Sequence, residues 1–521
     1  MTPCRALLAL LLATLAMGGL GAAPAHAGPG QISIMLDDDQ LLYRGDAERD
    51  FALNRMKLLG VDYARVSILW SVVAENARKT ARDRRRFRAD DPSTYPPGNW
   101  DRYDRLVRAA ERIGIGLYFN VTGPGPSWGH GKAPRSERAN RRTWKPKPRE
   151  YFKFVKAVGA RYSGAYRDEN DEGALVPRIS FWSIYNEPNQ GGWLTPQYMR
   201  RGSARVPWSP VMYRELWRYG RAALDQTGHD EDFVLAGETA PLGSDGVTSK
   251  SPIRPKKFIR ELFCIRPDGR RYTGRAAQAR QCSRLRRVDF RTSAWAHHPY
   301  TKKLPPDQRD TARDSISMAN ISDLGSLLDQ MASRTGRIGS DVPTILTEFG
   351  YETRPPDPFS GVSFEDQAAY INEGDLLAYR DPRIVGQTQF LLRDVPPVRG
   401  ARRNTKRYWF TYQSGLYNID GSPKPSAAAY ALPLVVTPSG DGVDVWGQLR
   451  FLPNGTQSEV GLEFKPEGSA EFRAVGEPVR VTNPLGFFEA QRSTPEPGTW
   501  RAMWRDPGSG AIAYSREVVV G

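Results

Sequence analysis

The feature that most constrains the fold is an eightfold alternation of short β-rich runs with amphipathic stretches between residues 31 and 430. Such alternation is typical of βα units around a parallel sheet, and the nearly continuous apolar character of the runs indicates strands buried on both faces. Eight units are the number that closes a (β/α)8 TIM barrel, and no Gly-x-Gly-x-x-Gly motif follows the first run to favour an open dinucleotide-binding sheet. The predicted strands are 31–36, 62–70, 115–121, 179–186, 233–237, 292–297, 344–349 and 386–392.

The intervening stretches have the apolar spacing of helices. Residues 103, 106, 107 and 110 form one such face, and residues 154, 155, 158 and 162 form another. Gly60 and Gly114 each stand where a helix must end and the next strand begins, a position that favours a left-handed residue.

The pattern changes near residue 436. From there to residue 521 the chain alternates polar and apolar residues between Gly, Pro and Asn turns, which predicts an all-β sandwich after a barrel that covers residues 28–435. The sandwich either packs against the barrel as a spacer or binds carbohydrate or cell wall. Trp446, Trp500 and Trp504 fit a core as well as a binding platform.

The N-terminus has the composition of an export signal. Residues 1–27 contain one Arg, an apolar run and the small-residue ending Ala25-His26-Ala27, so we predict a signal peptide and a secreted, extracellular protein. No later segment has the roughly 20 apolar residues of a membrane span. Removal of Cys4 with the signal leaves Cys264 and Cys282, for which we predict a disulfide, with two reduced thiols as the alternative.

The chain is basic, with a formal net charge of +16, and its arginines concentrate in residues 82–88 and 266–287. No helix-turn-helix, zinc-finger or RNP-type pattern accompanies them, which argues against nucleic acid as partner. Association with an anionic glycan or the cell wall fits the charge better.

Two glutamates carry the strongest functional signal. The fourth run ends in Asn186-Glu187-Pro188, and the seventh run contains Glu348 as its penultimate residue. These motifs resemble the clan of retaining glycoside hydrolases with a (β/α)8 barrel that includes cellulase-like and β-xylosidase-like families. The resemblance implies that Glu187 is the general acid/base, that Glu348 is the nucleophile and that Asn186 binds the sugar 2-hydroxyl.

The chemistry explains why two carboxyl groups are needed. Acetal cleavage requires a proton on the leaving oxygen and a second, ionised carboxylate at the oxocarbenium-like centre. A separation of about 5 to 5.5 Å between the two groups makes such an enzyme retaining. Because neighbouring strand residues face opposite ways, Asn186 and Glu187 both reach the site only if the strand end is irregular.

Further residues match the clan. Arg65 on the second run resembles the arginine beneath the nucleophile, and His298 and Tyr300 resemble a His-x-Tyr pair whose hydroxyl touches it, although a packed Tyr and a satisfied His would give the same pattern. The expected Trp at the end of the eighth run is absent, since Gln389-Phe390 stands there. Trp128, Trp193 and Trp208 follow the third and fourth runs and are candidates to stack on sugar rings or to pin loops.

Two other acids are candidates for the site. Glu238 follows the fifth run, either as a substrate contact or as a surface charge, and Glu352 is a weaker alternative nucleophile. No metal or organic cofactor is implied, and we expect a monomer.

The predicted function is a secreted retaining glycoside hydrolase that cleaves β-glycosidic bonds of a poly- or oligosaccharide by double displacement. The alternatives are a catalytically silent sugar-binding barrel and a basic adhesion or wall-binding protein. Endo or exo action and the sugar itself depend on loops that match no recognised pattern.

Overall fold

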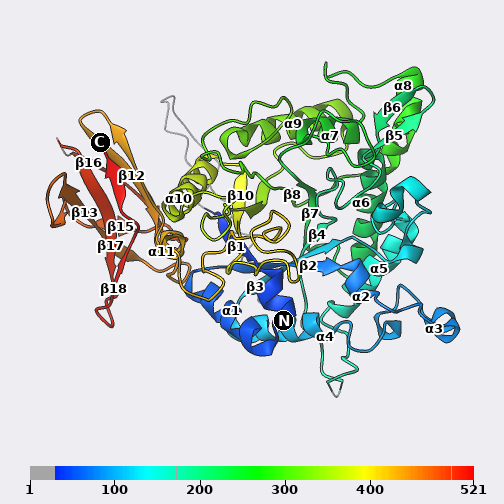
Figure 1. Ribbon diagram of the computed structural model, residues 1–521, viewed down its shortest axis with the longest axis horizontal. Helices are drawn as coiled ribbons and strands as arrows, with labels where there is room; N and C mark the ends of the chain where they lie inside the picture. The colour runs from blue at the N-terminus through cyan, green and yellow to red at the C-terminus, as the bar shows by residue number, and fades with distance from the viewer. Residues whose placement is uncertain (1–29, 172, 494–495) are drawn as a thin grey trace, which may run out of the picture.

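The computed structural model describes residues 30–171, 173–493 and 496–521, so the predicted signal peptide and Cys4 lie outside the described residues. Eight parallel strands close into a barrel in the order β1-β10-β9-β8-β7-β4-β3-β2, which confirms the predicted TIM barrel (Figure 1). Its strands are β1 (Ile32–Leu36), β2 (Tyr63–Leu69), β3 (Gly116–Thr122), β4 (Phe181–Ile184), β7 (Phe233–Thr239), β8 (Ala294–His297), β9 (Thr344–Phe349) and β10 (Ile384–Phe390). Each strand overlaps one of the eight predicted runs.

Helices surround the barrel, and the longer ones pack an apolar face against it. They are α1 (Asp46–Leu58), α2 (Trp70–Val73), α3 (Ala81–Arg86), α4 (Asp101–Ile113), α5 (Pro148–Arg161), α6 (Ser209–Asp225), α7 (Pro255–Leu262), α8 (Gly274–Ala279), α9 (Ser322–Thr335), α10 (Phe364–Arg380) and α11 (Pro425–Ala431). In α4 the residues at helical spacing, Tyr103, Leu106, Val107 and Ala110, are buried. Gly114 ends this helix at φ 78°, so the chain turns directly into β3.

The segments between strands carry additions that the periodicity does not predict. A hairpin of β5 (Tyr198–Arg201) and β6 (Ala204–Pro207) lies between the fourth and fifth barrel strands. Beyond the fifth strand, Cys264 and Cys282 form the predicted disulfide. The buried Arg214 on α6 donates to the carbonyl oxygens of Glu261, Leu262 and Arg280 and so fixes both ends of the disulfide-closed loop.

The C-terminal part is the predicted β-sandwich. One sheet holds β11 (Leu434–Ser439), β12 (Gly442–Gln448) and β16 (Phe487–Ser493). The other holds β13 (Ser458–Pro466), β14 (Arg473–Ala474), β15 (Val479–Val481), β17 (Gly498–Arg505), β18 (Ile512–Tyr514) and β19 (Val518–Val520). Trp446, Trp500 and Trp504 are buried, so all three are core residues rather than an exposed binding platform.

The sandwich packs against the barrel through α10 (Figure 1). Leu376 and Tyr379 on this helix meet Val435, Trp446 and Phe487 in one apolar cluster. Beside the cluster, a buried ion pair joins Arg450 Nη2 to Asp375 Oδ2 at 2.9 Å. Within the described residues, no helix combines the length and apolar character that crossing a membrane requires.

Candidate active site

A cavity of about 880 Å³ opens at the carboxyl ends of the barrel strands. This end of a (β/α)8 barrel is where its enzymes place their active sites, because the loops after the strands converge there. Residues from the ends of β1, β2, β4, β8, β9 and β10 line it, and they include Asn186, Glu187, Tyr300 and Glu348. The cavity is therefore built at one end of the barrel by segments that are far apart in the sequence.

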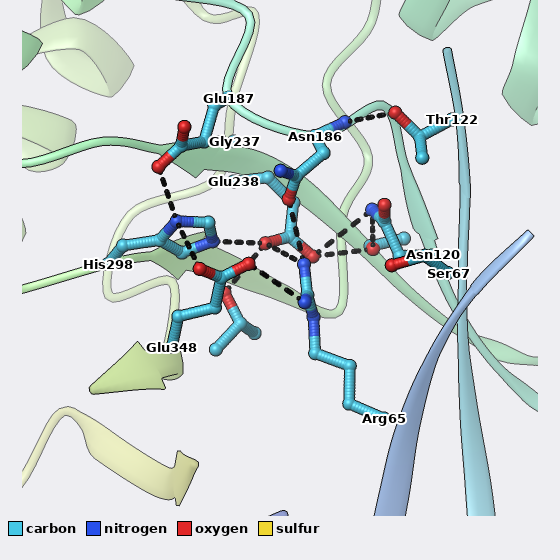
Figure 2. Close-up of polar contacts among 12 residues, drawn as sticks. Arg65, Ser67, Asn120, Thr122, Asn186, Glu187, Gly237, Glu238, His298 and Glu348 are labelled. Carbon is cyan, nitrogen blue, oxygen red and sulfur yellow. Dashed lines mark hydrogen bonds and ion pairs between the residues drawn. The ribbon is translucent and has the colours of Figure 1, made fainter. Parts of the chain in front are cut away.

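The end of β4 is irregular in a way that directs two successive side chains inward. The strand ends at Ile184, and the next residues include Tyr185 at φ 70° and Glu187 at φ 37°, both in the left-handed region. The Asn186 backbone N–H donates to Thr122 Oγ1 at 2.9 Å instead of continuing the ladder. Such backbone costs about 1–3 kcal/mol per residue and persists only where the surroundings enforce it. Here it places Asn186 and Glu187 on the same side (Figure 2).

Glu187 and Glu348 face each other across His298. One carboxylate oxygen of Glu187, one of Glu348 and one ring nitrogen of His298 all lie within 4.8 Å of one another. Inverting glycosidases keep their carboxyl groups about 6.5–9.5 Å apart to admit a water, whereas retaining ones hold them at about 5–5.5 Å. The separation here corresponds to the shorter class.

The two carboxyl groups have different surroundings. Glu348 accepts hydrogen bonds from Arg65 Nη1 at 2.9 Å and from the Tyr300 hydroxyl at 3.1 Å, whereas Glu187 accepts one from His298 Nδ1 at 2.9 Å. Burial raises the pKa of Glu348, and the charges of His298 and Arg65 oppose this rise. The Arg65 guanidinium contacts Glu348 and not Glu187, so its positive charge lies directly beside only one of the two carboxyl groups.

Glu238, on β7, has neither of the roles weighed for it from the sequence. Its side chain is fully buried, so it is not a surface charge, and it does not line the cavity as a substrate contact would. Six polar groups donate to its carboxylate: Arg65, Tyr118, Asn120, Ser183, His298 and Thr347. Despite desolvation, Arg65 and His298 hold the pKa of Glu238 well below its usual range. It is a buried anion beneath the site.

His298 stands between three carboxylates. Its Nε2 donates to Glu238 at 2.8 Å, its Nδ1 donates to Glu187, and Glu348 lies 3.6 Å from Nδ1. Although burial opposes protonation, Glu348, Glu187 and Glu238 raise the pKa of His298 to about 10. Glu187, His298 and Glu348 are close enough to share a metal ion, but an imidazolium with both nitrogens donating has no lone pair to offer one.

Arg65 also orients Asn186. Its Nη2 donates to Asn186 Oδ1 at 2.8 Å, so the amide oxygen is occupied and the amide nitrogen remains to donate to a ligand in the cavity (Figure 2). One buried guanidinium thus fixes Glu348, Asn186 and Glu238 together.

The aromatic residues divide between site and scaffold. Trp193 lines the cavity. Trp128, expected to stack on a sugar, is not among the lining residues: it packs against Trp70 and Phe87, and Arg78 lies 4.2 Å from its ring centre. It therefore pins a loop. Trp208 packs with Val206 and Val211.

The aromatic wall that was expected at the end of the eighth strand is made by other residues. Phe390 ends β10, lines the cavity and packs edge-on against Tyr300 and Tyr412. Tyr412 lines the cavity too and comes from the loop after β10, a position with no periodicity to mark it.

Asp38 is a cavity residue that the sequence reasoning missed. It follows β1, accepts from the Ser67 backbone N–H at 3.1 Å, and burial raises its pKa to about 6. The signal for it was a run of three aspartates at a strand end, residues 37–39. Glu352, the weaker candidate nucleophile, also lines the cavity, beyond Glu348 and Gly350.

Comparison with known proteins finds similar solved structures at low sequence identity. No protein-family model and no curated protein matches the chain. A solved family 39 glycoside hydrolase from Bacteroides cellulosilyticus WH2 is 13% identical over 92% of this chain and 81% of its own, with a TM-score of 0.49. A glucosidase from Croceicoccus marinus is 12% identical over 95% and 94%, with a TM-score of 0.47. A GH5_18 protein from Streptomyces cattleya, solved with GlcNAc, is 16% identical over 78% and 79%, with a TM-score of 0.45.

Proposed function

We propose that the protein is a retaining glycoside hydrolase that cleaves β-glycosidic bonds of a poly- or oligosaccharide. The observation that carries the proposal is the pair Glu187 and Glu348, held within 4.8 Å at the carboxyl ends of two barrel strands, with a guanidinium on one of them only. Each carboxyl group then has a separate task, as double displacement requires.

In the first step Glu348 attacks the anomeric carbon as the glycosidic bond breaks. Glu187 gives its proton to the departing oxygen, so the leaving sugar departs as a neutral alcohol and a glycosyl ester forms on Glu348. Tyr300 and Arg65 orient the attacking carboxylate through their hydrogen bonds. The Asn186 amide nitrogen is placed to donate to a sugar hydroxyl.

In the second step a water molecule attacks the anomeric carbon, and Glu187 takes its proton. The carbon–oxygen bond to Glu348 breaks, which restores the carboxylate and releases the sugar with its original configuration. Because Glu348 is uncharged while it is an ester, Glu187 can be negative without a second carboxylate facing it. His298 donates to Glu187 in both steps and holds its position.

The proposed setting is extracellular. The signal-type N-terminus and the disulfide between Cys264 and Cys282 support export to an oxidising compartment. We further propose that the enzyme acts as a monomer and that its basic surface associates with cell-wall or other anionic glycans.

The test is the isosteric variant Glu348→Gln on a panel of chromogenic aryl β-glycosides, with product configuration followed by NMR. We expect wild-type turnover with retention and a loss of about 10⁴-fold or more in the variant, because the nucleophile is removed. Product of inverted configuration, or a variant that remains active, would exclude double displacement at Glu348. A wild-type protein that binds glycans without turnover would identify a catalytically silent sugar-binding barrel.

A further inference from the structure

A second hollow, of about 350 Å³, lies next to the catalytic cavity. Its lining includes Asn140, Arg142, Thr143, Gln190 and Lys250. Gln190 lines both hollows, and the loop that supplies Leu242 to the catalytic cavity supplies Lys250 and Pro252 to the second one. The two hollows are therefore adjacent, with Gln190 between them. Each volume lies in the range of small-molecule binding sites.

The second hollow lies on the side of Glu187. The Gln190 backbone N–H donates to the Glu187 carbonyl oxygen at 2.9 Å, so a single turn joins the acid/base residue to the shared wall. The Gln190 side chain donates to Leu242 O at 3.0 Å, which fixes that wall. In a glycosidase the proton donor faces the glycosidic oxygen, and the leaving sugar extends from this oxygen. The hollow thus lies where the leaving sugar would go.

Its charge is opposite to that of the catalytic cavity. The catalytic cavity is lined by six acidic and two basic side chains: Asp38, Asp39, Glu187, Asp310, Glu348 and Glu352 against Lys302 and Lys303. The second hollow is lined by Arg142 and Lys250 and by no acid. In the described ranges no ion pair joins either cation to an acid, and both side chains are exposed. Nearby Glu137 is occupied by Asn140 Nδ2, at 2.6 Å, and by the Ser249 hydroxyl.

We propose that this hollow is the leaving-group subsite and that it selects a sugar carrying a carboxylate, a uronic acid, through Arg142 and Lys250. This inference rests on the proposed function, which decides that the leaving end of the bound glycan lies in the hollow. The preference for a negative charge rests on the residues that line the hollow. A guanidinium pairs with a carboxylate in two parallel hydrogen bonds, and an ammonium adds a point charge. The substrate would then be a glycan in which a neutral sugar precedes an acidic one.

Binding to the full-length protein tests the charge. The probes are trigalacturonate and its fully methyl-esterified form, which share one skeleton and differ in the ester methyl groups that remove the negative charges. We expect the acid to bind about tenfold more tightly than the ester, since charge-assisted hydrogen bonds are the stronger ones. Arg142→Ala with Lys250→Ala should remove this preference, and Arg141→Ala, at the neighbouring arginine that does not line the hollow, should keep it. Equal affinity for both probes, or a preference that survives the double variant, would overturn the proposal.

A third cavity, which also has basic side chains, provides the control for where the acidic sugar binds. Arg205, Lys257 and Arg313 line a cavity of about 400 Å³ beside the disulfide-closed loop. If Lys257→Ala with Arg313→Ala abolishes the preference and the Arg142 and Lys250 variants do not, the acid binds there and the proposal is wrong.

Turnover tests the direction. On an aryl glycoside that the wild type cleaves, methyl glucuronide should accept the glycosyl group about tenfold better than methyl glucoside, and the Arg142 and Lys250 variants should equalise the two. Hydrolysis of the aryl glycoside alone by the control variant Arg141→Ala should stay within about twofold, because that residue lines neither hollow. Equal transfer to both acceptors by the wild type would refute the leaving-group assignment. Selective acid binding without any glycoside turnover would instead leave the acid site standing and refute the proposed function.

Discussion

Glu238 shows how one buried residue organises the others in this site. An anion without solvent is stable only if hydrogen bonds and countercharges replace its hydration, and here six donors, among them Arg65 and His298, do so. The same two cations contact Glu348 and Glu187, respectively. Glu238 therefore positions the two proposed catalytic carboxyl groups indirectly, through Arg65 and His298, although it does not itself line the cavity.

The charge state of His298 gives a pH prediction. Its folded pKa, about 10, lies above its ordinary value of 6.5, so its contribution to stability is complete below about pH 6.5 and is lost as pH rises through 10. The lowered pKa of Glu238 acts in the opposite range: its contribution is present above about pH 4.5 and is lost as pH falls. We therefore expect the combined contribution of His298 and Glu238 to the free energy of unfolding to be greatest between about pH 4.5 and 6.5.

Urea unfolding from pH 6 to pH 10 measures this effect. The free energy of unfolding of His298→Gln should fall less steeply with pH than that of the wild type. His130→Gln is the matched control, since burial lowers the pKa of His130 to about 4 and that residue is neutral throughout the interval. Parallel curves for wild type and His298→Gln would show that His298 is not protonated in the fold.

Replacement of Glu187 should separate substrates by leaving group. In Glu187→Ala, sugars with poor leaving groups should be cleaved about 10²–10⁴-fold more slowly, whereas activated aryl glycosides need no proton and should be much less affected at the first step. Kinetics on the two substrate classes, with azide added to capture a β-glycosyl azide, measure the difference. Glu352→Ala, in the same cavity, should not discriminate between the classes. Equal slowing of both by Glu187→Ala would remove Glu187 from the acid role.

At the level of elements, the barrel strands and the loops that follow them contribute differently to the cavity. The barrel strands fix the direction of the side chains, and the left-handed residues after β4 bring two successive side chains to one side. Loops without repetitive structure complete the cavity, as with Tyr412 after β10. The disulfide-closed loop after α7 is another such element: it has few apolar side chains, and Arg214 and the Cys264–Cys282 bridge hold it.

Removal of the disulfide should cost stability with little effect on the proposed catalysis. The bridge closes a segment with a sequence separation of 18, for which chain entropy gives about 3 kcal/mol. Urea unfolding of Cys264→Ala with Cys282→Ala should show this loss, while aryl glycoside turnover stays within about twofold because the loop does not line the catalytic cavity. An unchanged free energy of unfolding would mean that Arg214 alone holds the loop.

At the scale of the whole molecule, the barrel and the sandwich share an interface built on α10. Arg450 reaches Asp375 from the sandwich side and also donates to the Tyr430 carbonyl oxygen at 2.8 Å. On the barrel side, the Tyr430 hydroxyl is 2.7 Å from Ser33 Oγ at the start of β1. The contact is continuous from the sandwich to the barrel wall, so the two parts should unfold together.

The ion pair at this interface can be tested by substitution. Because Arg450→Ala leaves Asp375 buried without its partner, we expect a loss of about 3–5 kcal/mol in the free energy of unfolding. Arg501→Ala, which removes a more exposed pair with Glu463 inside the sandwich, should cost about 1 kcal/mol or less. Unfolding followed by tryptophan fluorescence compares the two. Equal small losses would show that the apolar cluster alone holds the interface.

The distribution of charge also belongs to this scale. The chain carries a formal net charge of +16, yet most of the charged side chains that line its catalytic cavity are acidic. The total charge and the Arg-rich stretches can be read from the sequence, but the charge of the cavity cannot. The folded chain separates an acidic cavity from basic hollows, and the charge of the whole protein therefore does not indicate the charge of the sugar that binds beside Glu187 and Glu348.

The sequence by itself determined the strands of the barrel and of the β-sandwich from their periodicity. It also determined one disulfide, from the cysteine pair, and two glutamates at the ends of the fourth and seventh strands, from their local motifs. These depend on local patterns, because burial of a strand or a helix face repeats along the chain. The tertiary structure alone decided the rest. Glu238 became a buried anion, Trp128 a loop anchor and Phe390 with Tyr412 the cavity wall, because each role depends on neighbours more than 20 residues distant or on loops without a period. Such contacts are set by how the elements pack, which no single stretch of sequence encodes.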